Sequence, residues 1–422
     1  MPLRRAHRPR LLAALAAVAL ATSACTGLED LFQAGGGGGD PEGSADTTVP
    51  TSPTGEGSAG SDTTEATGPT VPVETTQPAE TSPPGDATPG TTADCDGTRP
   101  AGNDGTGFFV DGPTIHDPAG CPFVPMGFNA AVFWNVTGSD GQSSHEAQHR
   151  ASFAHQRAVG ANSVRIVTQT GGSFGWNADP ATQRELVELA VEQDLVPILE
   201  MHDATCDASI DAIPTYWTSP EMVQLANDHE DTLWINLANE HNFASPEAWL
   251  DGYTTMIGQL RAAGIRNPIM IDSAANCGQS PEAILRYGRD LLEADPQHNV
   301  IFSFHLYSFW RTGPATGQGF TPPNEVTAVF QDLADTGLAI HIGEFGWDQP
   351  ATDLVTYDPR VVLEQTLAHG FGWSFWSWYE DNPAFRAVSD IADTTPLDAL
   401  SPAGTALSEH LAANASPAST LG

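Results

Sequence analysis

Two apolar runs that lie far apart in the chain each lead into a glutamate. Residues 234–240 read WINLANE and residues 339–346 read AIHIGEFG, so Glu240 and Glu344 end strand-like segments. Parallel barrels place reactive groups at the carboxyl ends of their rigid strands, where the loops are open to substrate. Two carboxyl groups in such places can flank one glycosidic bond, one as proton donor and the other as nucleophile or base. An acid at a strand end can also simply cap the next helix, so the interpretation depends on the neighbours of the pair.

Polar or aromatic side chains also recur within the apolar runs or at their carboxyl ends. They are Arg165, His202, Asn239, His305, Tyr307 and Trp376. A single histidine in such a place is more often a satisfied core residue than a functional one. The repetition of polar groups at strand ends nevertheless indicates a site at one end of a barrel.

Eight apolar runs, separated by amphipathic helical patterns, are expected to position these residues. The expected strands are Phe123–Asn129, Ser163–Thr168, Val196–His202, Leu233–Glu240, Pro268–Ser273, Val300–Tyr307, Ala339–Phe345 and Gly372–Trp378. Alternation of strands and helices indicates repeated βα units on a parallel sheet, and eight strands close a barrel. We therefore predict a single α/β domain with the (β/α)8 TIM-barrel fold in residues 95–422.

Serine–proline pairs and glycines mark the helix boundaries. Ser245 and Ser280 each precede a proline and can cap a helix that begins there. The expected helices end at four glycines: Gly160, Gly264, Gly337 and Gly370. One helix carries an apolar stripe that should pack on the barrel wall, made of Trp249, Tyr253, Met256 and Leu260.

The order of these residues resembles that of glycoside hydrolase family 5, and the similarity extends from about Phe123 to Trp378. Three segments are particularly similar to the bacterial β-mannanase branch of that family: LEMHDAT (199–205), INLANE (235–240) and GEFG (343–346). The resemblance implies a retaining, double-displacement hydrolase of a β-linked polysaccharide that needs neither metal nor cofactor.

By the same resemblance, Glu240 is the general acid/base and Glu344 is the nucleophile. Arg165 and Tyr307, which the family pattern places beside Glu344, would favour its charged form. The negative charge of Glu344 would raise the pKa of Glu240, and would be lost when the glycosyl-enzyme ester forms, so that Glu240 can then act as base. Retention requires about 5–5.5 Å between the two carboxyl groups, whereas roughly 8 Å indicates inversion.

The family pattern assigns substrate contacts to four further residues. Asn239 would hydrogen-bond the 2-hydroxyl of the sugar, an interaction that strengthens as oxocarbenium character develops. His202 and His305 would complete the polar floor of the site. Trp376 would offer an apolar face to the sugar ring.

Other aromatic residues are candidates for additional sugar platforms or for packing. Trp373 and Trp378 lie on one strand, whose residues alternate between two faces, so either can belong to the barrel wall. Both roles are equally open for the aromatic residues that mostly follow strands: Phe133, Trp134, Trp176, Trp217, Trp310 and Trp347.

Three positions depart from the mannanase pattern. Cys277 stands where an NWGQ-like segment has tryptophan, so a sugar platform is missing there. His241 replaces a tryptophan that commonly follows the acid/base, and Ser308 replaces an acid that often follows the strand-six tyrosine. We predict endo-acting hydrolysis of β-1,4-mannan, glucomannan or galactomannan, with β-1,4-glucan or another β-glycan as the alternative substrate. A silent glycan-binding surface lipoprotein is a remote alternative, because the catalytic set is complete.

The N-terminal segment has the features of an export signal. Four arginines within residues 4–10 precede an apolar stretch, Leu11–Ala21, that is too short to span a bilayer. Small residues before Cys25 resemble a lipoprotein processing site and predict lipidation of Cys25, while an ordinary signal cleaved nearby is the alternative. Residues 26–94, rich in Gly, Ser, Thr, Pro and acids, are expected to form a disordered linker. The enzyme would then be extracellular and lipid-anchored to the outer face of a bacterial cell membrane.

The chain has five cysteines, and four remain when Cys25 is set aside. An even number in an exported protein favours disulfides over metal ligation. Cys206 and Cys277 belong to loops on one barrel face, while Cys95 and Cys121 lie in the N-terminal approach. We predict these two pairs among the three possible pairings, and no metal site.

The composition is strongly acidic and contains no lysine. The chain has 53 acidic and 16 basic residues, a formal net charge of −37, and twelve of the acids lie in residues 26–94. A nucleic-acid binder needs a basic face, so nucleic acid is excluded as a partner, whereas a neutral polysaccharide remains compatible. We expect a monomer that contacts a membrane only through its lipid anchor.

Overall fold

The computed structural model describes residues 95–131, 145–170, 178–206, 212–307, 323–347, 357–379, 386–388, 400–416 and 418. The predicted signal peptide, Cys25 and the linker lie outside these ranges, as do Phe133, Trp134, Trp176, Ser308 and Trp310. Within the described ranges, no helix combines the length and the apolar character needed to cross a membrane.

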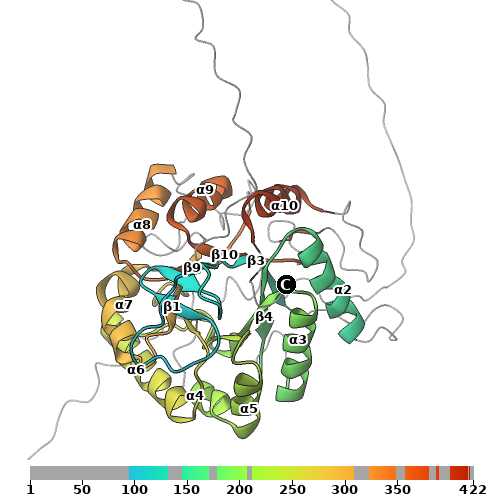
Figure 1. The fold of residues 1–422 in the computed structure, drawn as a ribbon. Helices are drawn as coiled ribbons and strands as arrows, with labels where there is room; N and C mark the ends of the chain where they lie inside the picture. The colour runs from blue at the N-terminus through green and yellow to red at the C-terminus, as the bar shows by residue number, and fades with distance from the viewer. Residues whose placement is uncertain are drawn as a thin grey trace, which may run out of the picture. The chain divides into compact units, whose positions relative to one another are not determined.

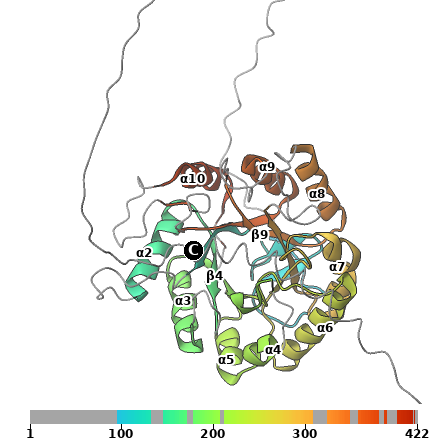
Figure 2. The same cartoon turned by 180° about the vertical axis from the view of Figure 1, so that it is seen from behind.

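Eight parallel strands form a closed barrel in the order β10-β3-β4-β5-β6-β7-β8-β9. Their bounds are β3 (Met126–Ala131), β4 (Ser163–Thr168), β5 (Val196–Met201), β6 (Trp234–Asn236), β7 (Ile269–Asp272), β8 (Val300–Leu306), β9 (Ile340–Phe345) and β10 (Gly372–Phe375). Helices ring the outside of the barrel (Figure 1, Figure 2). Each strand matches one of the eight expected from the sequence, so the predicted (β/α)8 fold is confirmed.

The helices begin and end largely where the sequence places them. Their bounds are α2 (His145–Ala158), α3 (Pro180–Glu192), η1 (His202–Ala204), α4 (Ala212–Trp217), α5 (Pro220–Asp228), α6 (Pro246–Ala262), α7 (Glu282–Ala294), α8 (Pro323–Asp335), α9 (Pro359–His369) and α10 (Pro402–Asn414). The Ser245 hydroxyl accepts the N–H of Ala248 at 3.2 Å and caps α6 as predicted. The four glycines expected to end helices all have positive φ, and the apolar stripe of α6 is buried.

The helix predicted to follow Ser280 begins one residue later than expected. Helix α7 begins at Glu282, and Pro281 occupies its cap position without a side-chain hydrogen bond. The carbonyl of Ser280 accepts a hydrogen bond from the hydroxyl of Ser273, at the end of β7. The Ser280 hydroxyl also accepts the N–H of Glu282 at 3.5 Å, so it contacts the first residue of the helix although Pro281 is the cap residue.

Strand β6 is shorter than the apolar run that contains it. The run was expected to remain a strand as far as Glu240, but the ladder ends at Asn236. Leu237 and Ala238 are fully buried beyond the ladder, and the N–H groups of Leu237 and Asn239 still donate to Met270 and Met201 of the neighbouring strands. Glu240 has a φ of +46°, a left-handed conformation that is uncommon for residues other than glycine. The glutamate therefore lies on a turn beyond the strand.

A hairpin that was not predicted lies against the amino ends of the barrel strands. Strand β1 (Phe109–Asp111) pairs antiparallel with β2 (Thr114–His116), and both lie inside the ring of helices in Figure 1. A buried apolar cluster joins this region to the barrel: Phe108, Val110, Ile115, Phe123, Val196, Ile198, Trp234, Met270, Ile301, Ala339 and Ala418. The amino ends are therefore filled with apolar side chains, which leaves the carboxyl ends for a polar site.

Both predicted disulfides are present. Cys95 bonds Cys121 in the N-terminal approach. Cys206 bonds Cys277 and joins the segments that follow β5 and β7. The predicted pairing is confirmed for both.

Candidate active site

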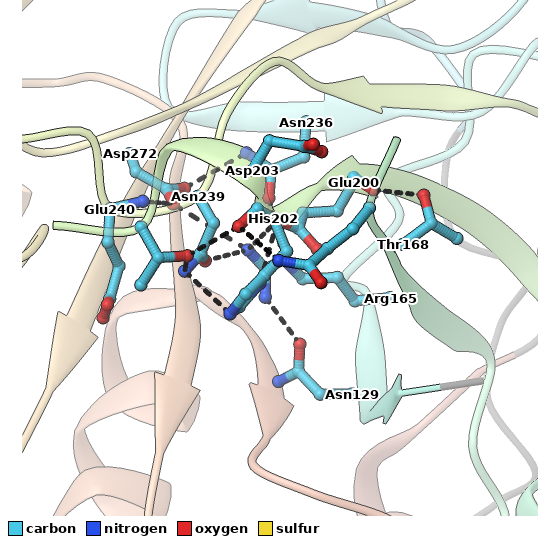
Figure 3. A network of polar contacts seen from close by, with 12 residues as sticks. Asn129, Arg165, Thr168, Glu200, His202, Asp203, Asn236, Asn239, Glu240 and Asp272 are labelled. Atoms are coloured by element: carbon cyan, nitrogen blue, oxygen red, sulfur yellow. Dashed lines mark hydrogen bonds and ion pairs between the residues drawn. The ribbon is translucent and has the colours of Figure 1, made fainter. Parts of the chain in front are cut away.

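The buried guanidinium of Arg165, on β4, is the centre of a polar network (Figure 3). It donates four hydrogen bonds of 2.7–2.8 Å, to Asn129, Asn236, Asn239 and Glu344. The carboxyl groups of Glu200 and Asp272 each lie 3.8 Å from its Nη2. Burial alone would lower the pKa of Arg165, but Glu200, Glu344 and Asp272 together raise it. The site therefore contains a permanent positive charge.

Glu344 lies on β9, where the sequence places it, and is 4% exposed. One of its carboxylate oxygens accepts a hydrogen bond from Arg165 Nη1 at 2.8 Å, and the other accepts the Tyr307 hydroxyl at 3.1 Å. Burial, and then the charge of Glu344, raise the pKa of Tyr307 well above its ordinary value, so this hydroxyl keeps its proton and donates. Arg165 and Tyr307 thus hold both oxygens of Glu344 in place.

Glu240 lies in a different environment. Its Oε1 is 2.8 Å from Nδ1 of His305, and its backbone N–H donates to Oδ2 of Asp272 at 2.9 Å. Burial, followed by the charges of Glu344 and Asp272, raises the pKa of Glu240 well above its ordinary value. The expected influence of Glu344 is present, but burial is the larger cause. Such a carboxyl group keeps its proton at a pH where an exposed glutamate is ionised.

The two glutamates converge despite their distance in sequence. One carboxylate oxygen of Glu240, one of Glu344 and a ring nitrogen of His305 lie within 4.8 Å of one another. Within the described ranges these three residues form a donor set that a cation could contact. Arg165 already donates to Glu344, however, and its positive charge opposes a second cation there. The arrangement favours proton transfer and nucleophilic chemistry over metal binding.

Asn239 and His202 extend the network beside the glutamates. The amide nitrogen of Asn239 lies 3.0 Å from the Thr205 hydroxyl and 3.3 Å from Nε2 of His202. Nδ1 of His202 is 3.1 Å from Oε1 of Glu200. Burial lowers the pKa of His202 to about 4 and that of His305 to about 3, so both rings are neutral near pH 7. A neutral His202 can donate from Nδ1 to Glu200 and accept at Nε2 from Asn239.

Trp376, which follows β10, lies beside this network. Its ring centroid is 5.8 Å from that of His202, with 24° between the ring planes. The peptide bond between Trp376 and Ser377 is cis. Trp376 is 5% exposed and belongs to the same buried cluster as the remaining tryptophan candidates within the described ranges, so burial does not separate it from them: Trp217, Trp347, Trp373 and Trp378.

Sequence reasoning missed several members of the network, namely Asn129, Glu200, Asn236 and Asp272. Each is a polar residue inside an apolar strand run, and a buried polar group needs partners. That signal could have identified them. Asp272 contacts three other residues of the network. Its carboxylate accepts hydrogen bonds from the backbone N–H of Glu240 and, at 3.1 Å, from Nδ2 of Asn236. It also lies 3.5 Å from Nε2 of His305.

Two of the positions that depart from the mannanase pattern are part of this site. His241 is 2% exposed, and its ring meets that of Phe243 edge-on at 4.2 Å. Cys277 is bonded to Cys206, so a disulfide stands where the pattern has an indole ring. Neither position presents an aromatic platform to a sugar in the way that the pattern implies.

A closed eight-stranded barrel that brings two glutamates together beyond the carboxyl ends of its strands has the architecture of a glycoside hydrolase. Residues 117–382 match the sequence profile described as Cellulase (glycosyl hydrolase family 5). The chain belongs to glycosyl hydrolase family 5.

Known members of the family are similar to much of the chain. A mannan endo-1,4-β-mannosidase from Salipaludibacillus agaradhaerens is 36% identical over 277 residues, which cover 64% of this chain and 81% of the relative. An enzyme of the same name from Cellvibrio japonicus (strain Ueda107) is 29% identical over 297 residues, which cover 68% of this chain but only 62% of the relative. The crystal structure of a β-mannanase from Streptomyces thermolilacinus with mannohexaose has a TM-score of 0.64 at 27% identity, covering 75% of this chain and 99% of that one.

Proposed function

We propose that the protein is a retaining, endo-acting hydrolase of β-1,4-mannosidic bonds in mannan, glucomannan or galactomannan. The proposal depends above all on the approach of the Glu240 and Glu344 carboxylate oxygens to within 4.8 Å. Retention needs carboxyl groups about 5–5.5 Å apart, whereas inversion needs a wider gap that admits water. The names of the mannosidase relatives support mannan as the substrate class.

In the first half of the reaction, the carboxylate of Glu344 attacks the anomeric carbon. The bond from this carbon to the glycosidic oxygen breaks, and Glu240 gives its proton to that oxygen as the leaving sugar departs. Arg165 and Tyr307 orient the attacking carboxylate, since each holds one of its oxygens. The product is an ester between the sugar and Glu344.

In the second half, Glu240 changes its role from acid to base. Ester formation removes the negative charge of Glu344, which is the second cause of the raised pKa of Glu240, so this pKa falls. Glu240 then takes a proton from a water molecule, whose oxygen attacks the anomeric carbon and releases Glu344. The lowered pKa of His305, about 3, keeps its ring neutral, with one N–H group. If that proton is on Nδ1, His305 donates it to Glu240 in both steps.

Asn239 and Trp376 are proposed to contact the sugar at the cleavage site. The amide nitrogen of Asn239 has two hydrogens, and Thr205 and His202 lie within hydrogen-bond reach of it. A 2-hydroxyl group that accepts a hydrogen bond from this nitrogen would therefore replace one of these partners. This exchange becomes favourable if the bond strengthens as positive charge develops on the ring. Trp376 would cover the apolar face of that ring.

A polysaccharide panel with product sizing tests the proposal. The purified protein is incubated with locust-bean gum, konjac glucomannan and carboxymethylcellulose, and the products are separated by chain length. Release of mixed short oligosaccharides from both mannans, with the β-anomer formed first by NMR, is the expected result. Release of monosaccharide alone would contradict endo action, and an initial α-anomer would contradict retention.

An endo-β-1,4-glucanase is the second candidate, since the matching family profile is described as a cellulase. The disulfide at Cys277, in place of a tryptophan, also changes the site relative to the mannanase pattern. The same panel separates the two candidates. Hydrolysis of carboxymethylcellulose at a rate above that of both mannans would favour the glucanase.

The N-terminal sequence supports a proposal about location. We propose that Cys25 is lipidated, that residues 26–94 form a linker, and that residues 95–422 form the catalytic domain of an extracellular monomer. Mass spectrometry of the mature protein should find an acylated N-terminal cysteine. An unmodified N-terminus, or one that starts elsewhere, would reject the anchor.

A further inference from the structure

The Cys206–Cys277 disulfide joins the two segments on either side of Glu240, the proposed acid/base. Cys206 follows η1, after β5, and Cys277 follows β7, while Glu240 follows β6. Because β6 lies between β5 and β7 in the barrel, the disulfide connects the two segments that flank Glu240. The bond thus joins the immediate neighbours of the reactive carboxyl group.

Cys206 contacts Glu240 on the β5 side. Its backbone N–H donates to the carbonyl of Glu240 at 3.1 Å, and its sulfur lies 4.0 Å from Oε2 of the same residue. The adjacent residues, Thr205 and His241, form an antiparallel bridge. Movement of Cys206 would therefore be transmitted to both the backbone and the carboxyl group of Glu240.

Gly278, which follows Cys277, contacts Glu240 on the β7 side. A Cβ atom at Gly278 would lie 3.1 Å from Cγ and 3.3 Å from Cα of Glu240, so the glycine backbone packs directly on the glutamate. The carbonyl of Gly278 accepts the N–H of His305 at 3.3 Å. His305 in turn binds the Glu240 carboxyl group. The position after the disulfide therefore touches both members of this pair.

The backbone around the disulfide is in a conformation that requires support. Cys206, Ala275, Asn276 and Cys277 have φ values between +48° and +57°, and Glu240 itself has +46°. A left-handed conformation is unfavourable for a residue with a side chain and persists only where the surroundings enforce it. A covalent link between Cys206 and Cys277 supplies such enforcement.

We propose that the Cys206–Cys277 disulfide is a positioning element for the acid/base, holding Glu240 at the distance and angle from which it protonates the leaving group. This inference rests on the proposed role of Glu240. Loss of the bond should let the flanking loops relax, so that Glu240 drifts from the glycosidic oxygen. Glu344 should be unaffected, because Arg165 and Tyr307 hold it from within the barrel.

The test compares leaving groups, because only a poor leaving group needs the acid. Rates of glycosylation are measured on phenyl and 2,4-dinitrophenyl β-mannobiosides for the wild type and for Cys206→Ser with Cys277→Ser. The matched control removes the other disulfide, Cys95→Ser with Cys121→Ser. All rates are taken at a temperature where circular dichroism shows each protein folded.

The Cys206/Cys277 variant should lose about 10- to 100-fold in kcat/KM on the phenyl substrate and less than about threefold on the dinitrophenyl substrate, since general acid catalysis contributes roughly 10²–10⁴-fold. The control variant should show the same small loss of kcat/KM on both substrates. Equal losses on both substrates in the Cys206/Cys277 variant, or no loss on either, would overturn the inference.

A second variant keeps the disulfide and disturbs the same contact, in case the cysteine variant does not fold. Gly278→Ala places a methyl group against Glu240 and should show the same leaving-group signature. Gly370→Ala is its matched control, because Gly370 has a φ of +69°, against +68° for Gly278, but nothing within 4 Å of the added carbon. A signature equal in both alanine variants would also contradict the inference.

The failure of the proposed function is distinguishable from the failure of this inference. If the wild type cleaves neither mannobioside but cleaves carboxymethylcellulose, the mannan assignment is wrong, and the same comparison is made with the two aryl cellobiosides. If the wild type cleaves no glycoside at all, the hydrolase assignment fails and the positioning role of the disulfide fails with it.

Discussion

The two ends of the barrel are made from the same eight strands but differ in what they bury. At the amino ends, rings such as those of Phe108 and Trp234 meet at 5.3 Å within an apolar cluster. At the carboxyl ends, Arg165 and several carboxyl groups are buried together. Five of the seven positive-φ residues other than glycine in the described ranges also lie in the segments beyond β5, β6 and β7.

The amino ends of the strands therefore contribute mainly to stability, and the carboxyl ends contribute mainly to chemistry. Apolar burial at the amino ends is favourable without any specific partner. Buried charges at the carboxyl ends cost desolvation and are tolerated only when paired and hydrogen-bonded. Substitutions at the two ends should therefore fail in different ways, and four experiments test this contrast.

The largest effect is expected for Glu344→Ala, which removes the proposed nucleophile. Turnover of every substrate should fall by roughly four orders of magnitude or more, because no ester can form. Thermal unfolding followed by circular dichroism should still show a cooperative transition. The control is Glu282→Ala, an exposed acid on α7, which should keep wild-type turnover. Near-normal turnover of Glu344→Ala would falsify the assigned role.

Glu240→Ala should show a smaller and selective loss. Cleavage of the phenyl mannobioside should fall by about 10²–10⁴-fold, the usual contribution of a general acid. The 2,4-dinitrophenyl substrate should still form the ester but release it slowly, since no base remains to activate water. A burst of dinitrophenol followed by a slow phase is the measurement, and a single slow phase without a burst would count against the acid/base role.

Phe108→Ala tests the opposite end of the barrel. Phe108 is 1% exposed and packs against Phe123 and Trp234, so truncation should lower the free energy of unfolding by about 3–5 kcal/mol. At a temperature where the variant is folded, kcat should be unchanged. Leu367→Ala, at a residue that is 52% exposed, is the stability control. A large fall in kcat for folded Phe108→Ala would show that the two ends are coupled.

Asp272→Asn should have the smallest effect and should change mainly the pH profile. The charge of Asp272 raises the pKa of Glu240, after burial and Glu344, so neutralising it lowers that pKa. Protonated Glu240 is needed for the first step, so the alkaline limb of kcat/KM should move to lower pH. Asp290→Asn, on the exposed face of α7, is the control. An unmoved limb, or one that moves to higher pH, would contradict this role for Asp272.

The sequence identified the parts of this molecule that depend on local pattern. Apolar runs predicted the strands, as in Ser163–Thr168, where the predicted and observed bounds agree. The same pattern placed the end of β6 too late, because the regular ladder stops at Asn236 although Leu237 and Ala238 are still buried and Leu237 still donates to Met270. Apolar sequence reports burial, and it does not mark the residue at which regular strand geometry ends.

The candidate site could be predicted only in part for a similar reason. Glu344 stands near the carboxyl end of β9, and Arg165 is a charged residue within an apolar strand, so type and position suggest function for both. Asn129 and Asp272 act through partners on other strands, and Asp272 contacts Glu240 across 32 positions of sequence. Which distant groups satisfy one another follows from barrel closure and register, which no single segment encodes.

Arg165 links several strands to one another inside the carboxyl end of the barrel. One planar group binds side chains from β3, β6, β9 and the turn after β6. The segments after β4 or β9 can therefore be exchanged in enzyme engineering without removing the hydrogen bond that Arg165 donates to Glu344. The segments after β5 and β7 are joined by the Cys206–Cys277 disulfide, so they should be exchanged only together.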